Sequence, residues 1–528
     1  MQDYYAGAPE LAPFFSGSPW DAEAYRRKAR EVAARFDAAA RRRAAAGMRP
    51  TSAGAAAKLE AVVREGGYFV TTGQQTGLLT GPLYTVYKAL SAVRLARALE
   101  PILERPVAPL FWVASTDHDW SEVNHVQLLD PENRLHRPEL AEAPGVPPVS
   151  MARHPVGPGI EDVLRQLAEL LPPSEFVAPL LARIREAYRP ERTMAEAFTD
   201  LIGELLGPFD VLLVDPSHPE VAALAAPLLR AEIQNAAEHE RRLERQTQRL
   251  VEAGYHGQVW VGGGAVNVAY EDAEGRERLV REDGSFQLRR TKRRLTEDEL
   301  LGLLETEPER FSATVLLRPV VESSLFPTVA YVGGPAELSY FAQTGCLFKA
   351  HGIEMPLVFP RFSVTLVERK VRKVMDKFAL TVDDFSQPVR ELSARIVREG
   401  LPPDVDAAVS ALRRQLDEGY EALLGATKAI DPTLKGPLTA AKNTSHIALR
   451  EAEKKILSHL KEQQATTLEQ LEKAAANLSP GGAAQERVLN PVQYLARYGP
   501  ELLSAVAEAL TVDLTAAAPT WRGVECGI

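Results

Sequence analysis

The sequence predicts an α/β fold whose core is a parallel sheet, followed by a long helical arm. Continuous apolar runs, typical of strands buried on both faces, alternate with stretches of helical periodicity. Glycine turns follow several of these runs, as in the strand, turn and helix units of parallel sheets. Beyond residue 361 the apolar residues recur at alternating spacings of four and three, the heptad pattern of a coiled coil.

Taken in order, the chain begins with helical segments at residues 20–47 and 55–65. A strand at residues 68–70, a glycine loop and a helix at residues 82–99 follow, and Pro82 suits a first helical turn. Further strands are expected at residues 107–115, 209–215, 314–320, 328–334 and 355–361, and further helices at residues 161–206, 219–253 and 335–351.

The arm carries a heptad seam over residues 405–430. Pro432 ends this helix, and a looser seam at residues 438–476 predicts a return helix, so the arm is an antiparallel hairpin. We expect its apolar surface to join two chains in a homodimer, the alternative being an intramolecular arm with no further role. An amphipathic tail at residues 490–506 is expected to fold back on the core.

A chain of 528 residues is too long for one hydrophobic core, so several domains are expected. Proline-rich residues and glycine turns mark two insertions into the sheet domain. The expected parts are a sheet core at residues 1–130, 207–254 and 313–362, a helical insertion at 131–206, a β-rich insertion at 255–312, a coiled-coil arm at 363–479 and a returning C-terminal segment at 480–528.

The composition is that of an ordinary globular protein, with 45% hydrophobic and 25% charged residues. A net charge of -10 argues against general nucleic-acid binding, and the basic run at residues 289–294 is interpreted as a solvated face or a small anion site. Two cysteines are too few for a disulfide framework and fit a reducing cytoplasm. No signal peptide or apolar span is recognised, so we expect a cytoplasmic protein outside the membrane.

The first polar cluster lies in the glycine loop after the strand at residues 68–70. The loop contains Gly73, Gly77 and Gly81, and its polar residues are Gln74, Gln75, Thr80, Tyr84 and Lys88. One interpretation is a cradle in which helix N-terminal N–H groups and the lysine bind an anion. The other is a structural turn with exposed polar groups, because a lone glycine-rich loop is a weak signal.

The second cluster directly follows the apolar run at residues 107–115. It contains Asp117, His118, Asp119, Glu122 and His125. On a helix, His118, Glu122 and His125 would share one face and could hold a metal, or they could act as acid, base and orienting carboxylate. A helix cap at Asp117 or Asp119 is the structural alternative. The number of ionisable groups beside a buried strand favours a functional role.

The third cluster is a second strand, turn and helix unit. Gly333 and Gly334 form its turn, and Glu337, Tyr340 and Gln343 follow on the helix. These side chains could face the same cleft as the first loop, although a carboxylate in a first helical turn is also a common stabilising feature.

Two further residues, Arg318 and Cys346, are single candidates outside these clusters. Arg318, at the end of an expected strand, could bind a substrate carboxylate or pair with a nearby acid. Cys346 is interpreted as a packed core thiol, because no base is placed to activate it.

Four segments carry a resemblance to a known family. They read TTGQQTGLLTGPLYTVYKALSA, FWVASTDHDWSEVNH, LRPVVESSLFPTVAYVGGPAELSYFAQ and LNPVQYLARYG. In order and spacing they resemble the cysteine-adding enzyme of bacillithiol biosynthesis, over nearly the whole chain. The resemblance implies a Rossmann-like core similar to nucleotidylyltransferases, inserted connecting domains and a C-terminal coiled coil that forms a homodimer.

The resemblance also implies a ligase that joins L-cysteine to the amine of glucosaminyl-malate. Its loop motif covers residues 73–88, and its acidic motif covers residues 117–125, which adds Asn124 to the candidates. Where the family leads us to expect a Gln-Asp pair, this chain has Val321-Glu322-Ser323. Related nucleotidylyltransferases use histidines in the first loop, where this chain has Gln74, Gln75 and Tyr84.

The chemistry of amide formation constrains the mechanism. Joining a carboxylate to an amine in water is uphill, so we expect ATP to activate the cysteine, with Mg²⁺ only as a companion of the nucleotide and no tightly bound metal. The loop at residues 73–81 with Lys88 would stabilise the negative charge, and His118 or Asp117 would accept the amine proton. Arg318 or Lys88 would bind the malate carboxylates. Asn490 and Tyr494 of the tail are further candidates for ligand contact.

Two alternatives stand beside the ligase. A metal-dependent hydrolase or transferase would use His118, Glu122 and His125. A non-catalytic coiled-coil scaffold would bind nothing at the glycine turns, but it has no need of polar residues at three strand ends.

Overall fold

The computed structural model describes residues 1–142, 145–399, 401–463, 465–514 and 523–528. The chain divides into two compact units, each described by itself below. Residues 1–365 with 486–526 form the sheet unit, and residues 366–485 with 527–528 form the helical unit. In the part of the chain described, no helix is both long and apolar enough to cross a membrane.

Six strands form the central sheet of the sheet unit, in the order β1-β6-β3-β2-β12-β13. All neighbours are parallel except the edge pair of β1 and β6. The first six residues of β2 are all buried, which explains why its sequence shows no polar alternation. The strands are β1 Met48–Pro50, β2 Tyr68–Gln75, β3 Val107–Ala114, β6 Leu212–Val214, β12 Thr328–Gly333 and β13 Leu357–Pro360.

Helices cover both faces of this sheet, as in a Rossmann-like fold. Phe69 packs in one apolar cluster with α4, α10, α13 and α14, and its neighbour Val70 packs in another with α2 and α5. Successive side chains of a strand point to opposite faces, which accounts for the two clusters. These helices are α2 Ala22–Arg35, α4 Ala53–Glu65, α5 Leu83–Leu103, α10 Pro219–Gln234, α13 Arg318–Leu325 and α14 Pro335–Ala350.

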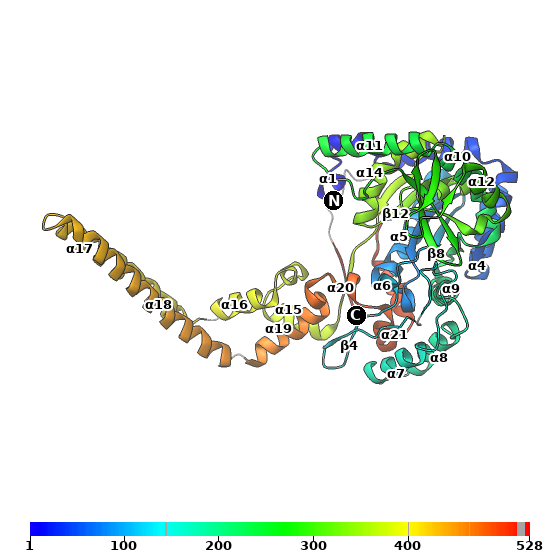
Figure 1. Cartoon of the computed structure of the whole chain (residues 1–528). Coiled ribbons are helices and arrows are strands. Elements are labelled where there is room, and N and C mark those ends of the chain that lie inside the picture. The colour runs from blue at the N-terminus through cyan, green and yellow to red at the C-terminus, as the bar shows by residue number, and fades with distance from the viewer. Residues whose placement is uncertain (143–144, 400, 464, 515–522) are drawn as a thin grey trace. The chain divides into compact units, whose positions relative to one another are not determined.

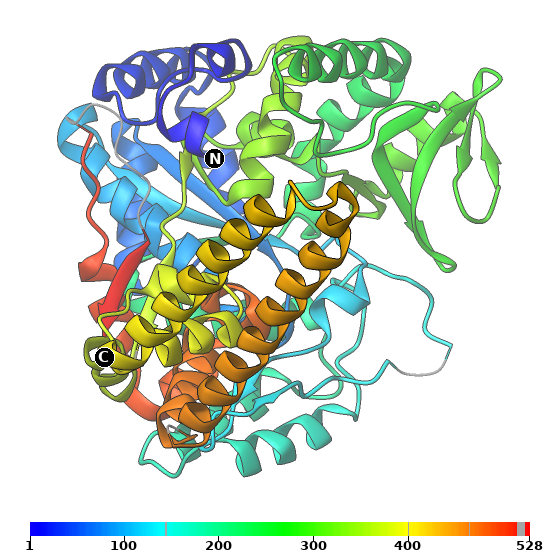
Figure 2. The same ribbon diagram turned by 90° about the vertical axis from the view of Figure 1, so that its left-hand side faces the viewer.

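Two insertions extend the sheet unit. A small antiparallel sheet, in the order β10-β9-β8-β7-β11, projects from the edge of this unit (Figure 2). Its strands are β7 Ala265–Asp272, β8 Gly275–Glu282, β9 Ser285–Leu288, β10 Arg294–Leu295 and β11 Phe311–Ala313, with helix α12 Glu297–Thr306. The other insertion is mainly helical and contains α7 Ile160–Leu170, α8 Val177–Ala187 and α9 Met194–Leu206.

Three predicted elements differ from the structure. The expected strand at residues 314–320 is a turn followed by α13, because Pro319 suits the first turn of a helix and would interrupt a ladder of hydrogen bonds. The helix expected at 219–253 is two helices, α10 and α11 (Ala236–Glu252). The helix expected at 20–47 is also two, because Asp37 caps α3 (Ala38–Ala46) with a hydrogen bond from Ala40.

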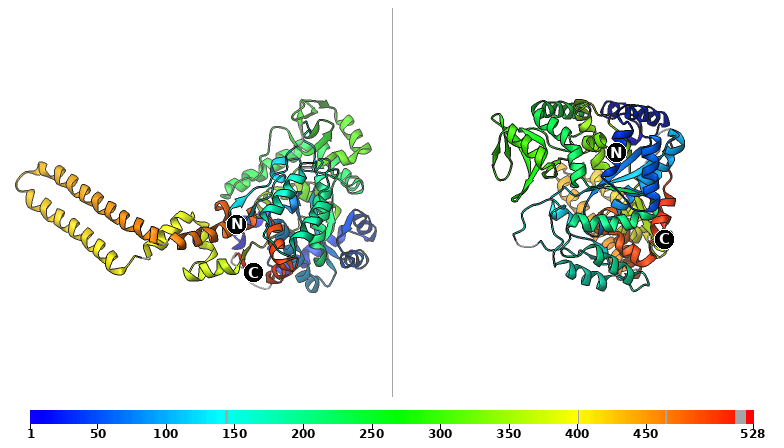
Figure 3. Two further views of the ribbon diagram at one scale, coloured as in Figure 1. Left: turned by 90° about the horizontal axis from the view of Figure 1, so that it is seen from below. Right: turned by 90° about the vertical axis from the view of Figure 1, so that its right-hand side faces the viewer.

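The helical unit contains the predicted hairpin. Helices α17 and α18 run side by side and antiparallel (Figures 1 and 3). Several large apolar side chains of the hairpin remain exposed, among them Leu412 at 46% and Leu423 at 44%. The helices of this unit are α15 Arg369–Lys377, α16 Val389–Glu399, α17 Pro403–Thr427, α18 Lys435–Gln463 and α19 Ala465–Leu478.

The C-terminal tail returns to the sheet unit, as predicted, in α21 (Pro491–Tyr498) and α22 (Glu501–Ala509). A buried ion pair holds the start of this return. Both Nη atoms of Arg361 donate to Glu486, at 2.7 and 2.8 Å, in the bidentate geometry that favours such pairs. The carboxylate also accepts from the backbone N–H of Val364, at 3.1 Å.

We expect Glu486→Ala to destabilise the protein by about 3 to 5 kcal/mol, because it leaves the buried Arg361 without its counterion. Chemical unfolding followed by circular dichroism measures the loss. Glu169→Ala removes an exposed partner of Arg165 and should change stability by less than about 1 kcal/mol. Equal losses of stability for the two substitutions would contradict the stabilising role of the buried Arg361–Glu486 pair.

Candidate active site

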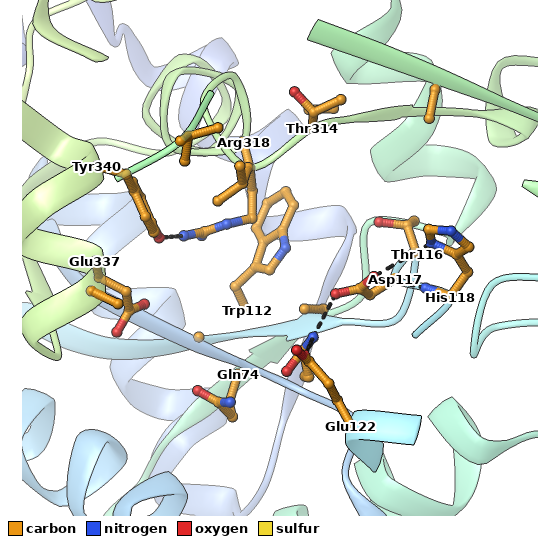
Figure 4. A pocket seen from close by; sticks show the side chains of 18 of the residues that line it. Gln74, Trp112, Thr116, Asp117, His118, Glu122, Thr314, Arg318, Glu337 and Tyr340 are labelled. Carbon is orange, nitrogen blue, oxygen red and sulfur yellow. Dashed lines mark hydrogen bonds and ion pairs between the residues drawn. The ribbon is translucent and has the colours of Figure 1, made fainter. Parts of the chain in front are cut away.

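A cavity of about 1080 Å³ lies at the carboxyl ends of β2 and β3 and beside the start of α14 (Figure 4). Parallel sheets bind their ligands at this edge. Asp117 and His118 lie on one side of it, and Glu337 and Tyr340 on the opposite side. The predicted site residues that line the cavity are Gly73, Gln74, Gln75, Tyr84, Lys88, Asp117, His118, Glu122, Arg318, Gly334, Glu337 and Tyr340.

Gln75 joins the two carboxylates of the acidic segment. Its Nε2 donates to Asp117 Oδ2 and to Glu122 Oε2, each at 2.7 Å. Burial alone would raise the pKa of Asp117, but hydrogen bonds from His118 and Gln75, with the charge of Arg276, hold it well below its usual range. Asp117 is therefore an ionised acceptor at neutral pH.

The imidazole of His118 lies between a cation and a carboxylate. Its Nδ1 is 3.3 Å from an Nη1 of Arg276 and 3.6 Å from Oδ1 of Asp117. A hydrogen bond from Arg276 requires a lone pair on Nδ1, whereas a hydrogen bond to Asp117 requires a proton there. The ring can thus present either an N–H or a lone pair at Nε2, depending on which neighbour it contacts.

Lys88 and Glu337 form a buried ion pair at 2.6 Å. The Nζ of Lys88 also donates to the carbonyl of Gly73 at 2.7 Å and to Gln74 at 2.9 Å. Burial would raise the pKa of Glu337, but Lys88 and the hydrogen bonds from Tyr331 and Gly334 lower it. The lysine charge is thereby matched inside the protein, which leaves Lys88 poorly placed as a free cation for malate.

Arg318 is likewise held by protein groups. It begins α13, and its guanidinium donates to Tyr340 at 2.6 Å, Tyr331 at 3.1 Å and Glu322 at 3.1 Å. Burial raises the pKa of Glu322 to about 7, with Arg318 opposing the shift. The residue that replaces the expected Gln-Asp pair therefore supplies a buried carboxyl to Arg318. Arg318 was predicted to lie at the end of a strand, and this was wrong, because it begins helix α13.

The small sheet contributes a further group of cations. Arg276 and Arg278 lie two residues apart on β8 and hence on one face of that strand. Neither arginine is among the predicted site residues, although basic residues at alternate positions of a β-rich segment are a usable signal. The cavity-lining residues outside the predicted set include Trp112, Thr116, Arg276, Arg278, Glu277, Thr314, Arg361 and Arg487.

The glycine loop is bonded to the C-terminal tail, although Tyr84 in the first turn of α5 lines the cavity. Asn490 donates to the carbonyls of Leu79 and Gly81, at 3.0 and 2.7 Å. The N–H of Leu83 is taken by the carbonyl of Leu489, at 2.9 Å. The tail thus covers this helix N-terminus, and the loop forms no open phosphate cradle.

Several predicted site residues lie outside the cavity lining. Gly77, Gly81 and Thr80 belong to the covered loop, and Asn490 stabilises that loop rather than facing the cavity. Gly333 ends β12 one residue before the cavity-lining Gly334. Asp119 is exposed and accepts from Ser121, at 2.8 Å. The remaining predicted residues that do not line the cavity are Asn124, His125, Gln343 and Tyr494.

Two of these outlying residues have clear structural partners. Asn124 donates to Glu139 at 3.0 Å, and its backbone carbonyl accepts from Leu140. Gln343 is buried and bonds both the N–H and the carbonyl of Val259, at 2.9 and 3.0 Å. Because Val259 lines the cavity, Gln343 positions a wall that it does not itself reach.

The predicted metal face does not form. Helix α6 covers only Trp120–Val123, so His118 precedes it and His125 follows it. Among the described residues, the group with suitably close ligand atoms is Glu232, His239 and His351, elsewhere in the sheet unit. There, Glu232 accepts from His239 at 2.6 Å, from His351 at 2.9 Å and from Asn267 at 2.9 Å.

A Rossmann-like sheet with helices on both faces, and a polar cavity at its carboxyl edge, defines the class as an α/β protein with an enzyme-type site. Comparison with known proteins gives the family. The N-terminal Rossmann-like domain of the bacillithiol biosynthesis protein BshC matches residues 1–362, and its C-terminal coiled-coil domain matches residues 364–513. The chain belongs to the BshC family of bacillithiol biosynthesis.

Individual relatives assigned as cysteine ligase BshC agree with this. The protein of Salinibacter ruber is 37% identical, over 85% of this chain and 81% of its own. The protein of Koribacter versatilis is 35% identical over 85% and 82%, and that of Solibacter usitatus 32% identical over 87% and 85%.

We expect the Glu232 cluster to make stability depend on acid pH. Burial opposes ionisation, but the two histidines lower the pKa of Glu232 to about 2, below the unfolded value near 4.5. The stabilisation, roughly 3 kcal/mol, is complete above the unfolded pKa and is lost as pH falls towards the folded one. The difference in urea-unfolding midpoint between wild type and Glu232→Gln should therefore shrink by about half between pH 7 and pH 3.

The exposed Glu252 on α11 provides the control, because Glu252→Gln should leave the midpoint close to that of wild type at both pH values. A midpoint difference for Glu232→Gln that does not change with pH would contradict the predicted ionisation.

Proposed function

We propose that this protein joins L-cysteine to the amine of glucosaminyl-malate through an activated cysteine carboxylate. Membership of the BshC family supports the reaction class. The observation that carries the proposal is the combination, in one cavity, of the Asp117–His118 pair with a cluster of cations. The Asp117–His118 pair could accept the proton that the amine loses. The cations could bind the carboxylates that both substrates carry.

In this proposal the sugar amine attacks the activated carbonyl carbon of cysteine. A C–N bond forms, the C–O bond to the phosphate-bearing leaving group breaks, and the nitrogen loses one proton. His118 accepts that proton at Nε2 when its Nδ1 proton is directed to Asp117, which is the tautomer that an ionised carboxylate favours. Gln75 holds Asp117 in place for this role.

The start of α14 is the better candidate for contact with the phosphate groups of ATP. Gly334, Pro335 and Ala336 line the cavity there; the N–H of Gly334 is bonded to Glu337 and Pro335 has none, so we propose the N–H of Ala336 as the phosphate donor. Arg487 lines the same cavity, and its side chain forms no ion pair with a carboxylate of the described residues. By contrast, the start of α5 is covered by the tail.

Incubation of the purified protein with cysteine, glucosaminyl-malate and ATP should give the amide product by mass spectrometry, and omission of ATP should abolish it. We expect His118→Asn to lower kcat by about 100-fold to 10,000-fold, the usual contribution of a general base. His218→Asn is the matched control, because His218 is exposed at the start of α10.

No product under any condition would exclude the ligase, and full activity of His118→Asn would exclude His118 as the base. Elemental analysis tests the metal-dependent alternative. Active protein without stoichiometric metal would exclude it.

We also propose that the α17–α18 hairpin joins two chains. Leu412 and Leu423 lie on the heptad seam and are exposed in the isolated chain, as residues that await a second copy would be. Wild type should sediment as a dimer, and Leu412→Glu with Leu423→Glu as a monomer. Ser410→Glu adds a charge of the same sign off the seam and should leave the dimer intact; a wild-type monomer would contradict the proposal.

A further inference from the structure

The arginines of the small sheet divide into two groups by their partners. Those that do not line the cavity are paired with carboxylates: Arg281 with Glu240, Arg293 with Asp272 and Arg294 with Glu282. Of those that line the cavity, Arg290 pairs with Glu277 at 3.4 Å. The arginine wall consists of Arg276, Arg278 and Arg289, which also line the cavity. Within the described part of the chain, these three form no ion pair.

Arg276 is the clearest case. Burial lowers the pKa of its guanidinium, yet its hydrogen bonds go to neutral acceptors, Ser312 Oγ at 3.0 Å and His118 Nδ1 at 3.3 Å. Asp117 and Glu271 attract it only from a distance. A cation withdrawn from water without a bonded counterion is costly, so this position is suited to an anion supplied by a ligand.

Arg278 and Arg289 show the same feature at the neighbouring position. The backbone N–H of Arg289 donates to the carbonyl of Arg278, at 3.1 Å, which makes the two residues neighbours across the hairpin. The side chain of Arg278 donates to the carbonyl of Val266, at 3.2 Å, and the charge of Arg289 helps to lower its pKa after burial. Two adjacent like charges repel unless an anion lies between or beside them.

We propose that the arginine wall binds the dicarboxylate end of the acceptor, the malate of glucosaminyl-malate. This inference rests on the proposed function and corrects its expected malate contacts, since Lys88 and Arg318 already have internal partners. Planar guanidinium groups bind carboxylates in bidentate fashion, and two carboxylates match a site with several guanidinium groups.

The position of Arg276 sets the orientation in which the acceptor binds. A carboxylate on Arg276 lies beside His118, so the acceptor enters with its acidic end on β8 and its sugar towards the Asp117 side of the cavity. An anion that draws Arg276 away from Nδ1 of His118 also leaves that nitrogen free to donate to Asp117. Acceptor binding then favours the tautomer that the proton transfer requires.

The test uses the full-length double variant Arg278→Gln/Arg289→Gln, which leaves the groups beside Asp117 unchanged. We expect the KM for glucosaminyl-malate to rise by about 10-fold to 100-fold, since charged hydrogen bonds are lost, while the KM for cysteine and ATP stays within about 2-fold. Arg294→Gln is the control, an exposed arginine of the same sheet paired with Glu282. Unchanged thermal unfolding of the double variant shows that it folds.

Calorimetry with glucosaminyl-malate, and separately with L-malate, tests binding without turnover. Binding by wild type and weaker binding by the double variant support the subsite even if no ligation occurs, so failure of the ligase and failure of the subsite are distinguishable. A rise confined to the KM for ATP assigns the wall to phosphate and overturns the proposal. Equal acceptor affinity of wild type and double variant, or no acceptor binding by wild type, overturns it as well.

Discussion

The buried ion pair of Lys88 and Glu337 is the interaction on which the geometry of the cavity depends. Taking both charges out of water is costly, and the pair is tolerated because each partner is surrounded by further hydrogen bonds. Lys88 binds the end of β2, and Glu337 binds the N–H of Gly334 and the hydroxyl of Tyr331. Through Tyr331 the network reaches Arg318 and α13. Three helices, α5, α13 and α14, and the two central strands β2 and β12 are thereby linked around one side of the cavity.

Charge is distributed unevenly around this cavity. Lys88 and Arg318 are paired with Glu337 and Glu322, whereas the arginine wall has no ion pair with a carboxylate of the described residues. In a chain of net charge -10, the arginine wall concentrates positive potential at this cavity. The ionised Asp117 near the arginine wall provides the opposite charge beside His118.

Sequence periodicity predicted the sheet, its two strand, turn and helix units and the helical hairpin, because burial imposes repeats that can be read locally. It placed Asp117, His118, Glu337 and Lys88 at strand or helix ends that meet in the cavity. Periodicity did not predict the role of a residue whose bonding partner is remote in the sequence. Nothing local indicates that Gln343 would bond Val259, or that Pro319 would start a helix carrying Arg318. Alternate basic residues marked β8 in the sequence, but only the fold brings Arg276 beside His118.

The contact between Asn490 and the glycine loop also has a consequence for how the protein is made. The loop around Leu79 and Thr80 contains two non-glycine residues with positive φ, and its carbonyls are bonded by a side chain 411 residues later in the chain. At about 5 to 20 residues per second, a ribosome needs about 20 to 80 s to cover that interval. Until then the nascent sheet unit lacks the tail that completes the loop. The loop is therefore completed only late in synthesis, and a chain that stops short of residue 490 leaves it without this support.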